Sequence, residues 1–244
     1  MKTKNIIAAF LVIVISTIVS AKEKKEAYSN ENYGLNYTGT TITVKFEKGS
    51  EFNHPLFAIW LADEKGGYIQ PLYVSESIGN GVFKRASRKA GRWQAGEIQR
   101  PAALPYWVHQ RGILNEFGTY NPTPQKPEVD AYTGATPNGS FILNSITEKP
   151  LNGKYKVMLE LNQSWDWNEF WYNNRYPEDK EFKTSSQPAL VYSVDIDTDK
   201  PQDEYVMNVI GRSHYSGEDG KLYEDLTTMT TALKIAKRIT VKIK

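Results

Sequence analysis

Cysteine is absent from the 244-residue chain, which excludes disulfides, thiol nucleophiles and lipid attachment through a cysteine. A chain without disulfides must be stabilised by its own hydrophobic core. Histidine is nearly absent too, with three copies, so there is little material for a zinc site. The chain also lacks an apolar run of the roughly 20 residues that a membrane-spanning helix needs.

A shorter apolar run marks the N-terminus. Lys2 and Lys4 precede the apolar residues 6–15, and small residues around Ala21 form a cleavage site. This pattern is typical of a secretory signal peptide over residues 1–21 and predicts a periplasmic protein. An uncleaved signal is the alternative, and it would be the chain's only link to a membrane.

Neither sign of charge dominates the chain. It has 30 Lys and Arg against 28 Asp and Glu, and removing residues 1–21 takes two lysines, which leaves 28 of each. A net charge near zero disfavours nucleic acid and an anionic membrane surface as partners. We expect a disordered lead-in over residues 22–36 and then a single domain over 37–244.

Short strands separated by turns predict an all-β fold. Residues 41–46 alternate apolar and polar side chains, and residues 56–61 and 68–74 flank a Gly-rich turn as a hairpin. We expect the other strands at residues 140–147, 154–161, 189–195, 205–210 and 239–243. A helical turn is expected at 231–238. Seven or more such strands favour an immunoglobulin-like β-sandwich.

One long stretch breaks this pattern. Residues 75–135 are rich in Gly, Pro and basic side chains without a clean period, which predicts an irregular insertion with a short helix near 104–115. Its basic residues are candidates for binding a phosphate or carboxylate, although such clusters are more often ordinary solvated surface. They are Arg85, Arg88, Lys89, Arg92 and Arg100.

The most specific pattern is the heptad of residues 130–136, which reads Asp-Ala-Tyr-Thr-Gly-Ala-Thr. It resembles the acceptor sequence to which a flavin transferase joins FMN in extracytoplasmic bacterial proteins. By that resemblance, the hydroxyl of Thr136 becomes the phosphoester oxygen. Asp130 would hold the turn through backbone N–H groups, and Thr133 completes the motif.

Small residues in the heptad fit the same hypothesis. Gly134 and Ala135 leave room for a transferase to close over the backbone, and Gly134 can adopt a positive φ. The alternative is that the Asp, Thr, Gly, Pro and Asn residues of positions 130–139 simply form a connecting turn between strands.

Aromatic side chains gather in residues 164–172. Trp165, Trp167 and Trp171 are candidates for stacking on a flavin ring or a sugar, and packing against the sandwich is the alternative. His214 lies in a second distinctive stretch, residues 213–220, where it is a candidate hydrogen-bond donor to a flavin.

Three further readings of the sequence are weaker. His214 with Asp219 or Asp225 would suit a hydrolase or a metal, although a Gly-built turn is the simpler interpretation. Asp195 and Asp197 begin a calcium-loop-like spacing, but Lys200 stands where an EF-hand needs Gly. We therefore expect a solvated strand there.

Several segments in order resemble an uncharacterised family of predicted periplasmic proteins, domain-of-unknown-function family 2271, which is called flagellar-hook-like for its immunoglobulin-like fold. The matching residues are 58–63, 130–136, 153–155, 160–166, 187–192, 213–217 and 230–232. The resemblance implies an extracytoplasmic redox role, because genes for such proteins often neighbour flavin transferases and membrane reductases.

The leading hypothesis is an exported electron carrier with FMN on Thr136, served by a flavin transferase and a membrane redox partner. The alternative is a non-enzymatic binding module of the cell envelope for carbohydrate or a protein, supported by the Trp-rich stretch. The sequence leaves open whether the chain is an enzyme.

Overall fold

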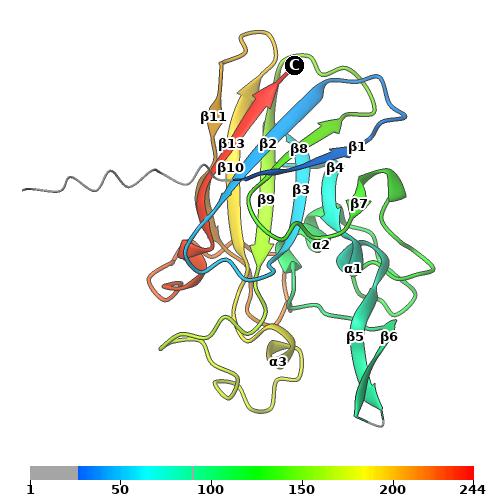
Figure 1. Cartoon of the computed structure of the whole chain (residues 1–244), viewed down its shortest axis with the longest axis vertical. Coiled ribbons are helices and arrows are strands. Elements are labelled where there is room, and N and C mark those ends of the chain that lie inside the picture. Colours follow the sequence, from blue (N-terminus) through cyan, green and yellow to red (C-terminus); the bar gives the residue numbers. More distant parts are fainter. Residues whose placement is uncertain (1–26, 90) are drawn as a thin grey trace, which may run out of the picture.

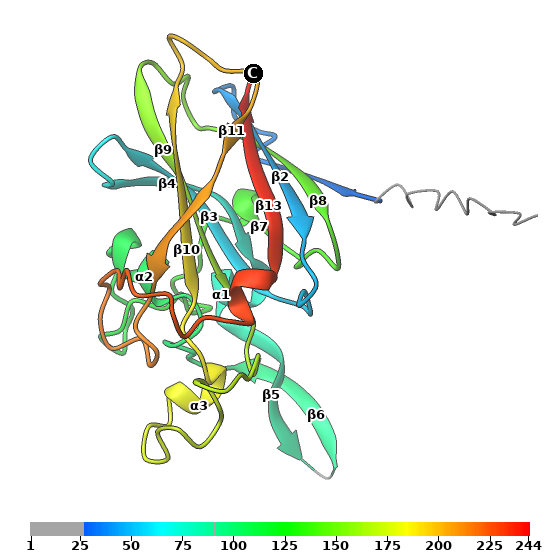
Figure 2. The same cartoon turned by 90° about the vertical axis from the view of Figure 1, so that its left-hand side faces the viewer.

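The computed structural model describes residues 27–89 and 91–244. The expected signal peptide and residues 22–26 of the expected lead-in lie outside these ranges. Two β-sheets face each other across a hydrophobic core, and a two-stranded hairpin projects from one end (Figures 1 and 2). The expected all-β sandwich is confirmed, and its immunoglobulin-like character stays a prediction.

Eleven strands build the two main sheets among the described residues. The first sheet has the order β1 (Ser29–Tyr33), β8 (Phe141–Ile146), β2 (Thr41–Lys48), β13 (Ala236–Ile243) and β11 (Tyr205–Val206). The second has the order β12 (Asn208–Arg212), β10 (Leu190–Asp197), β9 (Lys154–Asn162), β3 (Leu56–Asp63), β4 (Tyr68–Ser75) and β7 (Thr133–Gly134). Apart from the parallel pairs β1–β8 and β4–β7, neighbouring strands are antiparallel.

The remaining elements are short. The projecting hairpin consists of β5 (Val82–Lys89) and β6 (Arg92–Glu97), and the α-helices are α1 (Glu76–Asn80), α2 (Pro105–Arg111) and α3 (Phe182–Ser185). Two 3₁₀ turns are η1 (Asp130–Tyr132) and η2 (Ala232–Lys234). No helix of the described chain is both long and apolar enough to cross a membrane.

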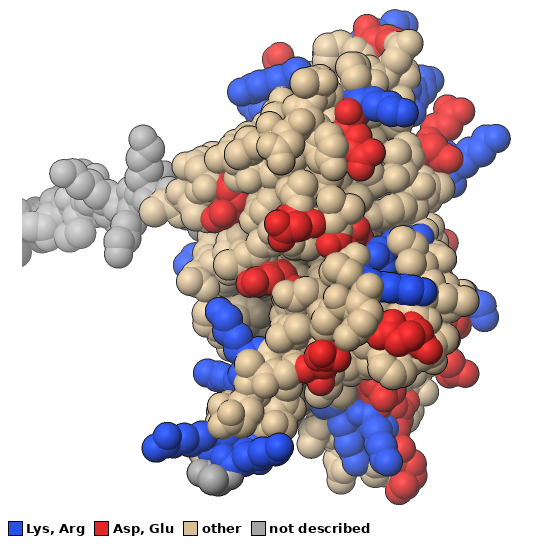
Figure 3. Space-filling model, turned by 90° about the vertical axis from the view of Figure 1, so that its right-hand side faces the viewer, with Lys and Arg blue, Asp and Glu red and all other residues tan. Residues whose placement is uncertain are grey.

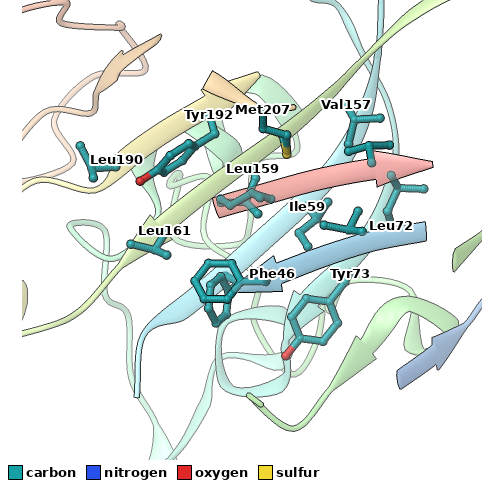
Figure 4. Packing of buried hydrophobic residues seen from close by; sticks show 14 of the residues in the cluster. Phe46, Ile59, Leu72, Tyr73, Val157, Leu159, Leu161, Leu190, Tyr192 and Met207 are labelled. Carbon is teal, nitrogen blue, oxygen red and sulfur yellow. The ribbon is translucent and has the colours of Figure 1, made fainter. Parts of the chain in front are cut away.

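The main core lies between the two sheets (Figure 4). Strand β2 alternates buried and partly exposed residues, so Ile42, Val44 and Phe46 point inward. Phe46 is fully buried and stacks on Phe141 at 5.0 Å between ring centroids. The alternation that predicted this strand is therefore the pattern that fills the core.

Strand β3 is buried on both faces, which explains its nearly continuous apolar sequence. One face joins the main core, and the other packs Trp60 into a second cluster with Val108 and Trp107 of α2. Helix α2 begins with Pro105 and ends at Gly112, whose φ of 72° suits glycine. It is the short helix expected near residues 104–115.

Three local expectations were wrong. Residues 29–33 of the expected disordered lead-in form strand β1, which pairs with β8. The strand expected over 205–210 is divided, because Met207 leaves β11 and is buried in the core before β12 begins. The helical turn expected over 231–238 is limited to η2, and β13 already starts at Ala236.

The insertion expected over 75–135 is more ordered than its sequence predicts. It contains α1, the β5–β6 hairpin, α2, η1 and β7. The hairpin has polar and charged side chains on most positions, so it offers no apolar period from which a strand can be recognised.

Candidate functional site

The acceptor-like heptad occupies one edge of the six-stranded sheet. Its first three residues form η1, and Thr133 and Gly134 form β7, which pairs in parallel with Val74 and Ser75 of β4. The Asp130 carbonyl, rather than its carboxylate, accepts the bonds that hold the turn, from the Thr133 backbone N–H and its hydroxyl. The role expected for the Asp130 side chain is therefore filled by its backbone.

Thr136 lies two residues after the last residue of β7 and is half-buried. Its hydroxyl donates a hydrogen bond to Oγ of Ser75 at 3.1 Å, and that oxygen also accepts the backbone N–H of Phe57. The Thr136 side chain is thus tied to the sheet edge and still lines a surface pocket.

Tyr73 holds the backbone of the same segment from within the core. Its hydroxyl is 3.1 Å from the carbonyl oxygen of Ala135 and 3.3 Å from that of Gly134. Burial raises the pKa of Tyr73 far above its ordinary value, so the phenol stays protonated and can donate to these carbonyls. The heptad backbone is therefore held by a buried side chain.

Gly134 is required for space and not for an unusual backbone angle. The expected positive φ is absent, because Gly134 is an extended residue of β7. A Cβ at this position would lie 2.0 Å from the hydroxyl of Tyr33 in β1. Tyr33 in turn packs on Tyr73 with ring centroids 5.0 Å apart. The glycine thus lets the N-terminal strand close over the heptad.

This contact gives a first prediction. We expect Gly134→Ala to destabilise the protein by about 1–3 kcal/mol, because the new methyl group must displace the Tyr33 ring. Urea unfolding of the variant measures the loss. In a Tyr33→Ala background, the same substitution should cost much less, and an equal cost in both backgrounds would show that Tyr33 is not the obstacle.

The pocket at Thr136 has a volume of about 590 Å³. Its walls come from three parts of the chain: the segment from α1 through the β5–β6 hairpin to Arg100, the heptad, and the aromatic stretch. Trp165 and Trp93 are both about half-exposed and both line it. The structure thus brings Thr136, Ala135 and Trp165 together, as the sequence hypothesis required.

Basic side chains dominate the charge of this pocket. Lys84, Arg85 and Arg100 line it, against the single acid Glu76. The Arg100 guanidinium lies 4.2 Å from the ring centroid of Phe83, and its buried Nε has no hydrogen-bond partner among the described residues. Burial lowers the pKa of Arg100, yet an arginine remains charged. A partly buried cation with an unused donor favours an anion.

The other heptad residues face a neighbouring hollow. Asp130, Thr133 and Gly134 line a second pocket of about 300 Å³. Ala135 of the heptad and Glu76 and Asn80 of α1 line both pockets. The heptad therefore lines two neighbouring hollows, of which the larger has Thr136 in its wall.

Three predicted site residues lie elsewhere. Trp171 is 3% exposed and packs in the main core, where its Nε1 donates to Thr228, so it presents no face to a ligand. Trp167 is exposed but does not line the Thr136 pocket. The His214 ring packs on Tyr215 with ring centroids 4.3 Å apart and tilted by 31°, outside that pocket too. The structure supplies no site that joins these three to Thr136.

His214 serves a local turn. Its Nδ1 accepts the backbone N–H of Ser216 and lies 3.0 Å from the Ser216 hydroxyl, which is itself buried. Asp219 accepts a hydrogen bond from Tyr223, and Asp225 accepts one from Thr227. Asp219 and Asp225 are thus engaged locally, and the carboxylate that lies near Nε2 of His214, at 3.9 Å, is that of the exposed Glu218.

The described residues contain no group of three or more His, Asp and Glu side chains that could hold a metal. Asp197, from the calcium-like spacing, instead accepts the backbone N–H groups of Asp199 and Lys200 in a turn. Asp195 pairs with Lys156 of the neighbouring strand. This agrees with the simpler interpretation of that segment.

Most residues that line this pocket have no site prediction from the sequence, among them Glu76, Lys84 and Trp93. The signal for Trp93 was available in principle, because a tryptophan among charged residues without an apolar period is a candidate for exposure. Glu76 had no such signal.

No protein-family model, curated protein or solved structure matches this chain. The resemblance to the uncharacterised periplasmic family therefore remains a proposal, and the argument for function rests on the site itself.

Proposed function

We propose that this protein is an exported electron carrier that holds FMN through a phosphoester on Thr136. The observation that carries the proposal is the convergence of three sequence-distant elements on one pocket. The Thr136 hydroxyl, the exposed rings of Trp93 and Trp165, and a set of cations all line it. A heptad that served only as a connecting turn would not need these side chains to line the same pocket.

The residues present fit an esterified flavin nucleotide. A volume of about 590 Å³ lies within the range of cofactor pockets. A phosphodiester keeps one negative charge, and Arg100 offers a buried Nε without a partner, with Lys84 and Arg85 nearby. Trp93 and Trp165 offer flat surfaces for an aromatic ring system.

Attachment is a balanced exchange of bonds. The Thr136 oxygen forms a bond to the flavin-side phosphorus of a flavin dinucleotide, the phosphoanhydride bond breaks, AMP leaves, and the hydroxyl proton passes to solvent. The hydrogen bond from Thr136 to Ser75 fixes the rotamer of the side chain before this reaction. Tyr73 fixes the backbone on either side of Ala135.

Bound FMN would supply one- and two-electron chemistry, and the protein would supply orientation and electrostatic tuning. Trp93 and Trp165 would limit the positions of the ring, and the cations would favour negative charge on the cofactor. The pocket is open to solvent on one side, which leaves a path for electron exchange with a membrane redox partner.

The test is chemical and does not depend on activity. After co-expression with a flavin transferase, we expect the intact mass to rise by one FMN less one water, and the purified protein to be yellow. Thr136→Ala should remove the added mass completely, because Thr136 has the one hydroxyl of the heptad that lines the larger pocket.

Thr136→Ser is the matched control, since it keeps a hydroxyl at the same position and should still be modified. A protein that stays unmodified and colourless under these conditions would refute the proposal. So would modification that persists in Thr136→Ala.

A further inference from the structure

The exposed tryptophans of this protein gather at one end of the molecule. Of six tryptophans, Trp60, Trp107 and Trp171 are buried, whereas Trp93, Trp165 and Trp167 are 51–54% exposed. Trp93 belongs to the β5–β6 hairpin, and Trp165 meets it across the shared pocket. Both segments lie at the lower end of the views in Figures 1 and 2.

The hairpin at this end carries a concentrated positive charge. Residues 82–97 contain five basic side chains and one acidic one, so the rest of residues 22–244 has four more acids than bases. Figure 3 shows Lys and Arg at the tip of this hairpin, whereas the neighbouring part of the same end carries both signs of charge. The five cations are Lys84, Arg85, Arg88, Lys89 and Arg92, and all are exposed.

Few side chains of the hairpin are buried, so packing does not account for its cations and its exposed tryptophan. Its base is anchored by Phe83, which joins the second hydrophobic cluster, but the residues of its outer half are exposed. Arg88 lies opposite Trp93 and Lys89 opposite Arg92 across the two strands. Like charges on opposing strand positions destabilise a hairpin, so this pattern is not selected for folding stability.

We propose that this tryptophan-rich, basic end docks on the surface of an anionic phospholipid bilayer. Lys and Arg are attracted to anionic headgroups, and tryptophan prefers the boundary between headgroups and acyl chains. A projecting ribbon reaches a flat surface without obstruction from the sandwich. The neutral charge of the whole chain conceals this property, because the opposite charges lie on other parts of the molecule.

The geometry favours a bilayer over an acidic protein or a soluble polyanion. Inorganic polyphosphate needs cations but gives no reason for three exposed indoles around them. A folded protein partner needs a complementary shape, whereas the exposed rings here come from two separate protruding segments. Docking would turn the mouth of the Thr136 pocket toward the membrane, but the inference does not require a bound flavin.

Vesicle binding of the unflavinylated mature chain tests the inference. We expect co-sedimentation with vesicles of phosphatidylcholine and phosphatidylglycerol in equal parts, little with phosphatidylcholine alone, and weakening as salt rises. The triple variant Arg88→Gln, Lys89→Gln, Arg92→Gln should bind about 100-fold more weakly. Brominated phosphatidylglycerol should quench tryptophan fluorescence, and Trp93→Ala should reduce that quenching.

The matched control is Lys65→Gln, Lys242→Gln, Lys244→Gln, which removes three exposed cations outside the hairpin and should bind like the parent. Lys244 is the C-terminal residue, far from the hairpin in Figure 1. Unchanged circular dichroism and thermal midpoint would show that the hairpin variant is folded, as exposed substitutions predict. Absent vesicle binding, equal loss in both triple variants, or binding only to soluble polyphosphate, polyglutamate or a neutral glycan would overturn the inference.

Discussion

The free energy of unfolding should fall as the pH rises from about 5 to 8. Glu160 of β9 is fully buried, and this burial raises its pKa to about 8, against 4.5 for an ordinary glutamate. The folded state therefore keeps a proton that the unfolded chain has released. The contribution of Glu160 to the free energy of unfolding is fully present below pH 4.5. It is lost as the pH rises toward 8, by about 1.4 kcal/mol per pH unit.

Local hydrogen bonds oppose the burial of Glu160 without outweighing it. Its two carboxyl oxygens accept the backbone N–H groups of Tyr106 and Trp107 in the first turn of α2, at 3.1 and 2.7 Å. These donors lower its pKa, as does Ser213. They also show why a glutamate is placed here, since the first N–H groups of a helix have no partner within the helix.

Urea unfolding across this pH range, followed for parent and Glu160→Gln, measures the effect. The variant should be less stable at pH 5 by about 1–3 kcal/mol, because its amide presents an N–H₂ to one of the helix N–H groups. Its stability should change little with pH, whereas the parent should lose about 3–4 kcal/mol between pH 5 and 8, so the two curves should meet and cross before pH 8. Parallel curves would show that Glu160 does not titrate in this range.

Phe46→Ala should destabilise the protein by about 3–5 kcal/mol. Phe46 is fully buried at the centre of the main core, where it stacks on Phe141 and meets Phe57 edge-on at 5.2 Å. Removing the ring opens a cavity between the two sheets that rigid strands on both sides cannot close. A loss this large would be a substantial part of the stability of a typical domain.

Chemical denaturation at a fixed pH gives the comparison. Lys242→Ala is the control, because Lys242 is exposed on the adjacent strand β13 and should change stability by less than about 0.5 kcal/mol. A cost for Phe46→Ala near that of the control would mean that the sheets are not packed as described.

The sandwich was predictable because its core strands carry a strong period. Residues 41–46 alternate, and residues 56–61 form a continuous apolar run between turn residues. Strand β1 was missed because its sequence, Ser-Asn-Glu-Asn-Tyr, is polar and depends on pairing with β8. Tertiary pairing decided its structure against its local preference.

The pocket was only partly predictable for a different reason. The heptad identified Thr136 by its own sequence, and the aromatic stretch offered three tryptophans without indicating which would be buried. The structure separates them, since Trp171 fills the core and Trp165 faces the pocket. No local pattern encodes that Trp93 and Arg100 meet Thr136, because this depends on how the 75–135 segment returns to the sheet edge.

The parallel pairing of β1 with β8 has a consequence for the order of assembly. Residues 32 and 144, bonded through their side chains, are 112 positions apart, and closing so long a loop is slow. The first strand to leave the ribosome is thus among the last to find its neighbour. Until it does, Tyr33 is missing from its place over Gly134. A modifying enzyme would therefore encounter the complete surface around residues 130–136 only after β1 has paired with β8.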